Sequence, residues 1–128
     1  MAGVGLVHGM AHAVGARCGV AHGTANGILL PHVMRFNVES AGPKLALVAR
    51  ALGCEAVKDE GKLALAAADA VASLLSRIGH PTRLSEVGVD AGDFTSLAAL
   101  ALSDPASATN PRALRSADEI VELYRRAL

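Results

Sequence analysis

The sequence contains few aromatic residues and no tryptophan: Phe36, Phe94 and Tyr124 are the only three among its 128 residues. Any core must therefore be built from aliphatic side chains, mainly alanine, leucine and valine, which favour closely packed helices. Hydrophobic residues make up 52% of the chain, and this share excludes a disordered, highly charged tail. The length is that of one domain, spanning residues 1–128.

The chain also lacks an excess of charge of either sign. Twelve lysines and arginines balance twelve acidic residues, so nothing favours binding to a nucleic-acid backbone. The two cysteines, Cys18 and Cys54, are too few for a disulfide scaffold and show no CxxC spacing. This cysteine content is typical of a protein in a reducing cytoplasm. The first residues lack the basic and compact apolar regions of a secretory signal, so we expect none, and the uncharged stretch at residues 18–34 contains two histidines, an asparagine and a proline. We expect a soluble, cytoplasmic protein that binds neither membrane nor nucleic acid.

Hydrophobic spacing predicts an all-α chain of five to six helices without a linker that would divide it. The predicted helices cover residues 6–17, 22–37, 43–52, 60–78, 94–102 and a last segment that ends at residue 128. Pro31 is expected to weaken or kink the second helix, and Pro43 suits the first position of the third. Residues 83–92 are predicted to form a loop.

Capping signals and apolar stripes refine these helices. Asp93 is predicted to cap the fifth helix, and Ser116 with Glu119 forms a capping-box pattern before the last one. The helix at residues 60–78 is predicted to bury one apolar side, which consists of Leu63, Ala67, Ala70, Leu74 and Ile78.

Histidines are concentrated in the first quarter of the sequence, at His8, His12, His22 and His32. His8 and His12 lie one helical turn apart on the same face, where two imidazoles can share a metal ion. Cys18 adds a Cys-x3-His spacing with His22, so a four-ligand zinc site can also be drawn. Ordinary boundary histidines and a small buried cysteine explain the same residues. Glycines at every fourth position from 15 to 27 fit either a ligand site or close helix packing.

One long segment narrows these alternatives. Residues 5–37, GLVHGMAHAVGARCGVAHGTANGILLPHVMRFN, resemble the signature region of the iron-containing (group III) alcohol dehydrogenases, in particular the lactaldehyde reductase and propanediol dehydrogenase branch. The resemblance continues through the Gly-His-Pro turn at 79–81, the segment 84–89, Asn-Pro-Arg at 110–112 and residues 118–124. It implies a helical bundle like the C-terminal part of the dehydroquinate synthase-like fold.

The resemblance also implies roles for three histidines. His8 and His22 match the third and fourth metal ligands of the family, with iron(II), or alternatively zinc, as the metal. His12 matches a histidine beside the nicotinamide and the substrate, so the resemblance replaces the pairing of His8 with His12. Ala106 falls near a position where close relatives carry a cysteine. His80 replaces a residue that is usually apolar, and we expect it on a surface loop.

The implied activity is the interconversion of a small primary alcohol or diol and its aldehyde with NAD(P). The other two implied ligands, an aspartate and a histidine on an upstream helix, have no counterpart in this sequence, and no glycine-rich phosphate loop is present. The histidine segment starts within the first eight residues, so we expect the chain to begin inside a larger architecture, without the N-terminal nucleotide-binding domain. We expect the isolated chain to be inactive and to associate through an uncovered apolar face, as a homo-oligomer. The alternatives are a non-catalytic helical bundle and a metal-binding or interaction module.

Overall fold

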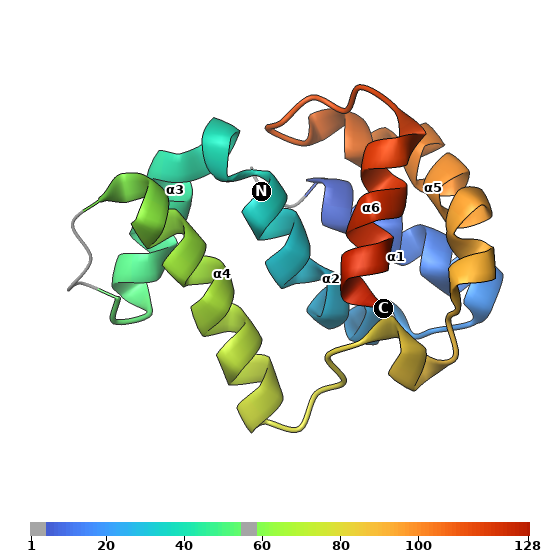
Figure 1. Cartoon of the computed structure of the whole chain (residues 1–128), viewed down its shortest axis with the longest axis horizontal. Coiled ribbons are helices and arrows are strands. Elements are labelled where there is room, and N and C mark those ends of the chain that lie inside the picture. The colour runs from blue at the N-terminus through green and yellow to red at the C-terminus, as the bar shows by residue number, and fades with distance from the viewer. Residues whose placement is uncertain (1–4, 55–58) are drawn as a thin grey trace.

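The computed structural model describes residues 5–54 and 59–128, which form six α-helices and no strand (Figure 1). The expectation that the chain begins inside a larger architecture concerns residues 1–4, and these lie outside the described residues. The helices are α1 (Gly5–Cys18), α2 (His22–Phe36), α3 (Val38–Ala51), α4 (Glu60–Arg77), α5 (Phe94–Ser103) and α6 (Ala117–Ala127). Three 3-10 turns join them: η1 (Leu84–Val87), η2 (Ala91–Asp93) and η3 (Pro105–Thr109). The all-α prediction is confirmed, and no described helix combines the length and apolarity needed to cross a bilayer.

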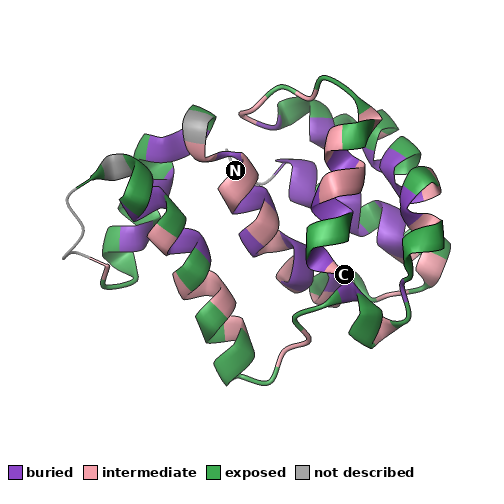
Figure 2. Cartoon of the chain, in the orientation of Figure 1, coloured by how far each residue is buried: buried purple, intermediate pink, exposed green. Residues whose placement is uncertain are grey.

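Buried side chains form two clusters, which α2 joins (Figure 2). The larger cluster lies among α1, α2, α5 and α6, and the smaller one lies between α3 and α4 with Met34 of α2. Leu30 packs against both clusters. As the composition predicts, alanine, leucine and valine supply most of the described core. The larger cluster contains the buried residues of α1, so it holds the histidine segment in position.

Two buried polar contacts tie distant parts of the chain to this core. The Tyr124 hydroxyl donates to the Met10 carbonyl at 2.8 Å, which links α6 to the middle of α1. Burial raises the pKa of Tyr124, so the hydroxyl keeps its proton and remains a donor. Asn37 and Asn110 exchange amide hydrogen bonds of 3.0 and 2.7 Å, which fix the end of α2 against the segment after η3. Both contacts hold α1 and α2 in place.

The predicted caps of the last two helices are wrong in detail. The Ser116 side chain makes no capping bond, and Glu119 accepts from the Arg115 backbone N–H at 2.6 Å, one residue before the position that a capping box requires. Asp93 likewise does not cap α5 with its side chain. It forms a capping box with Asp90 around η2, one turn earlier, so the predicted loop at 83–92 is wound into 3-10 turns. The starts of α5 and α6 are nevertheless correct to about one residue.

The predicted apolar side of α4 is buried only over its first half. Leu63 and Ala67 are buried against α3, whereas Leu74 and Ile78 are exposed. The reason is that α4 extends well beyond α3 (Figure 1). Helix α3 starts earlier than predicted and is broken at Ala41, so Pro43 lies in the first turn of its second part. Pro31 does not interrupt α2.

Candidate active site

The candidate site lies where α1 meets the start of α2. On α1, the residues around the histidines are buried, including Val7, Gly9 and Ala11, whereas His8 and His12 are exposed. After Cys18 the backbone reverses through Gly19, whose φ of 71° is left-handed and suits glycine. This turn places His22, the first residue of α2, next to the two histidines of α1.

The three imidazole rings form one exposed cluster. The ring centroids of His8 and His22 are 5.6 Å apart with planes inclined by 13°, and those of His12 and His22 are 4.8 Å apart. His8 and His12 are farther apart, at 6.3 Å. The expectation that His8 and His12 share a face of α1 is therefore confirmed, and His22 joins them from the next helix. The metal roles of His8 and His22 remain predictions.

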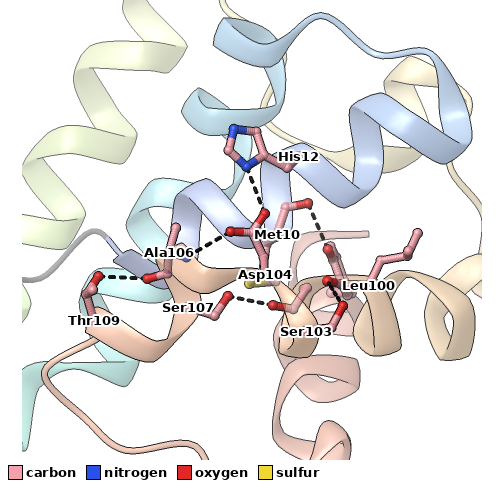
Figure 3. Close-up of polar contacts among 10 residues, drawn as sticks. Met10, His12, Leu100, Ser103, Asp104, Ala106, Ser107 and Thr109 are labelled. Atoms are coloured by element: carbon pink, nitrogen blue, oxygen red, sulfur yellow. Dashed lines mark hydrogen bonds and ion pairs between the residues drawn. The ribbon is translucent and has the colours of Figure 1, made fainter.

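The orientation of His12 depends on a residue that the sequence analysis missed. Its Nδ1 lies 2.9 Å from Oδ2 of Asp104, at the junction of α5 and η3 (Figure 3). The other carboxylate oxygen of Asp104 accepts from the Ala106 backbone N–H at 2.8 Å. The hydrogen bond from Ala106, followed by that from His12, lowers the pKa of Asp104. In the sequence, 92 residues separate Asp104 from His12, so no local pattern links the two.

Two glycines of α1 allow η3, and with it Asp104, to approach this closely. A Cβ at Gly5 would lie 2.6 Å from the Ala106 carbonyl oxygen, and one at Gly9 would overlap the Ser107 hydroxyl. That hydroxyl is itself fixed, because it donates to the Ala101 carbonyl at 2.6 Å (Figure 3). Any larger residue at these two positions would push η3 away from α1.

The other candidate residues lie apart from this cluster. Cys18 packs against the larger core, and burial raises the pKa of its thiol, which disfavours the thiolate needed for zinc. Within residues 5–54 and 59–128, no group of three or more histidine, cysteine or acidic residues is positioned to hold an ion, so the four-ligand zinc interpretation is not supported.

The remaining histidines also lie outside the cluster. His32 is half-buried, and burial, followed by Arg35, lowers its pKa. His80 is half-buried rather than fully on the surface, with Nδ1 2.7 Å from the Pro81 carbonyl oxygen. A Cβ at Gly27 would overlap its ring, so this glycine serves packing. At Gly23, by contrast, a Cβ would meet nothing within 4 Å, so the regularly spaced glycines share no single purpose.

The donor set of the cluster fits half of a transition-metal site. Imidazole nitrogens suit iron and zinc, and metal–nitrogen bonds are about 2.1 Å long. The ring centroids of His8 and His22 are 5.6 Å apart and those of His12 and His22 are 4.8 Å apart, so ring separation alone does not select which two imidazoles would share an ion. Two imidazoles leave several coordination positions unfilled, which agrees with the absence of a complete ligand group in the described part of the chain.

The chain matches a known protein family over its whole length. The profile of the Fe-containing alcohol dehydrogenase family, C-terminal part, matches residues 1–128. A lactaldehyde reductase of Escherichia coli (strain K12) is 46% identical over 129 residues, covering 98% of this chain and 33% of the relative. A 1,3-propanediol dehydrogenase of Citrobacter freundii is 38% identical over 130 residues, with the same coverage.

Solved structures give the same result for the fold. The crystal structure of a 1,3-propanediol oxidoreductase superimposes with a TM-score of 0.89 at 35% identity, over 96% of this chain and 32% of that chain. The chain thus spans about a third of the length of the relatives it matches.

Proposed function

Because the chain belongs to the iron-containing alcohol dehydrogenase family, over the C-terminal part of that family, we propose that it supplies half of the metal site of such an enzyme. The enzyme would interconvert a small primary alcohol or diol and its aldehyde with NAD(P). The observation that carries this proposal is the convergence of His8 and His22, from two helices, into one exposed cluster.

The named relatives support a small alcohol as the substrate. Two of the similar proteins are a lactaldehyde reductase and a 1,3-propanediol dehydrogenase. Both names describe short substrates with a primary alcohol or aldehyde group. We therefore propose a substrate of this class for the enzyme to which the chain contributes.

His8 and His22 would hold the metal, iron(II) or alternatively zinc, together with an upstream aspartate and histidine. When bound, the ion supplies Lewis acidity, which makes an alcohol hydroxyl easier to ionise and an aldehyde carbonyl easier to reduce. His8 lies in the first turn of α1 between buried neighbours, and His22 is the first residue of α2. Both side chains are exposed, and the packing of α1 and α2 in one core fixes the backbone positions from which they project.

His12 would contact the substrate and the nicotinamide instead of the metal. Its Nδ1 is engaged by Asp104, so its Nε2 is the nitrogen available to a substrate oxygen. Hydride transfer between the alcohol carbon and the nicotinamide needs that carbon held in one orientation. A fixed imidazole beside the reacting oxygen provides one such contact.

The remaining parts of the enzyme would come from an upstream nucleotide-binding domain. Large apolar side chains are exposed on the described surface, among them Leu47 of α3, Ile78 after α4 and Leu100 of α5. Cover for such side chains is expected in the working enzyme, from the upstream domain or from a second copy of the chain.

A chimera tests the proposal. In it, these 128 residues replace the matching third of the Escherichia coli lactaldehyde reductase. We expect the purified, iron-loaded chimera to oxidise 1,2-propanediol with NAD, because the relative provides the ligands and the nucleotide site that this sequence lacks. The 128-residue chain alone, loaded in the same way, is expected to show no turnover. A folded, iron-containing chimera without activity would contradict the proposal, as would activity of the chain alone.

A further inference from the structure

We infer that Asp104 is a positioning residue for His12: it keeps the proton on Nδ1 and leaves Nε2 as a hydrogen-bond acceptor for the substrate hydroxyl. The identity of the substrate group rests on the proposed function. The position of the proton on the His12 ring does not rest on the proposed function, because it follows from contacts within this chain.

The two oxygens of the Asp104 carboxylate have separate partners. Oδ1 accepts from the Ala106 backbone N–H at 2.8 Å, and Oδ2 faces Nδ1 of His12 at 2.9 Å. An ionised carboxylate can only accept, so this second bond requires a proton on Nδ1. A neutral imidazole carries one N–H, and Nε2 is then left with its lone pair.

The carboxylate that imposes this arrangement is itself well anchored. The Ala106 hydrogen bond makes Asp104 the N-cap of η3, and that bond, with the one from His12, lowers the pKa of Asp104. Because Gly5 and Gly9 admit η3 against α1, the carboxylate and the histidine are held by packed backbone on both sides. Both partners are thus in place before a substrate arrives.

The other face of His12 is open to a ligand. Its side chain is 55% exposed, whereas that of Asp104 is 19% exposed. The second ring nitrogen points away from Asp104 (Figure 3). An alcohol hydroxyl that donates to this nitrogen would be fixed in direction by the same carboxylate. With the proton on Nε2 instead, this nitrogen could only donate, and the hydroxyl would have to turn.

Nitrogen-15 NMR of the metal-free 128-residue chain tests the inference, since the two ring nitrogens have distinct shifts in each tautomer. At a pH where the ring is neutral, the wild-type spectrum is expected to show His12 mainly as the Nδ1–H form. Asp104→Asn is expected to reverse this tautomer. Its Oδ1 can still accept from Ala106, but its amide nitrogen replaces Oδ2 and donates to Nδ1. The proton then moves to Nε2.

Asp90→Asn is the matched control. Asp90 also caps a 3-10 turn, accepting from the Gly92 N–H at 2.8 Å, but it faces no histidine, so its variant should leave His12 unchanged. A wild-type ring that is mainly the Nε2–H form would overturn the inference even if Asp104→Asn fails to fold. An unchanged tautomer in a folded Asp104→Asn protein would overturn it as well.

The chimera provides the functional arm. Asp104→Asn is expected to lower its kcat/KM by about 10- to 100-fold, as is typical of carboxylates that orient a functional histidine. A reversed tautomer with unchanged kcat/KM would reject the positioning role in the reaction. A chimera that is inactive before any substitution would reject the proposed function, while the tautomer experiment still decides how Asp104 acts on His12.

Discussion

Replacing His8 or His22 by alanine in the chimera is expected to remove the bound iron and to lower alcohol oxidation by about 1,000-fold or more. Each substitution deletes one of the two imidazoles that this chain contributes. The ion would then lack one of its four proposed ligands, and its Lewis acidity is worth several kcal/mol of barrier. Iron content by elemental analysis and the rate of NADH formation measure the two effects.

His12→Ala is the matched control for this experiment, because His12 lies in the same exposed cluster. Its removal should leave the iron content unchanged and should reduce turnover. If the His8→Ala protein retains stoichiometric iron while the His12→Ala and His22→Ala proteins lose it, the ligand assignment is wrong. The rings would then have been assigned in the wrong order, since distances alone place His12 nearer to His22 than His8 is.

Gly9→Ala is expected to lower the free energy of unfolding by up to about 2 kcal/mol, which is the ~1–3 kcal/mol typical of an overpacked contact less about 1 kcal/mol of helix preference. The new Cβ would overlap the Ser107 hydroxyl, which cannot turn aside without breaking its bond to the Ala101 carbonyl. Alanine is the better helix former by about 1 kcal/mol, so the measured loss is the steric cost minus this gain. Urea unfolding followed by circular dichroism gives the value.

Gly23→Ala tests the same substitution where there is room. This glycine also lies in a helix, α2, and a Cβ there would meet nothing within 4 Å. Its variant should be more stable than the wild type by about 0.5–1 kcal/mol, from the helix preference alone. Equal effects of the two substitutions would show that η3 does not press on α1 as closely as the structure indicates.

Much of the helical architecture could be predicted from the sequence, because apolar spacing and breakers such as Gly53 and Gly79 are local signals. Which side chain caps a helix was less predictable, because a shift of one or a few residues changes the N–H group that a carboxylate reaches: Asp93 and Glu119 accept from Asp90 and Arg115. Burial along α4 could not be predicted, because it depends on where α3 ends and not on the periodicity of α4 itself.

In the candidate site, too, local patterns could be predicted from the sequence and contacts between distant segments could not. His8, His12 and His22 could be singled out because they lie within a short, recognisable segment. Asp104 could not, because only the packing of η3 on α1 brings it to His12. The glycines at 5 and 9, which make that packing possible, stand four residues apart, but a Gly-x3-Gly spacing does not indicate which segment will pack against it.

Diffraction from crystals of the iron-loaded chimera, collected at the iron absorption edge, tests the central claim most directly. The claim predicts one anomalous peak about 2.1 Å from a ring nitrogen of His8 and of His22, with His12 outside the coordination shell and still bonded to Asp104. A peak bound by His12 in place of either residue, or no peak between the His8 and His22 rings, would contradict it.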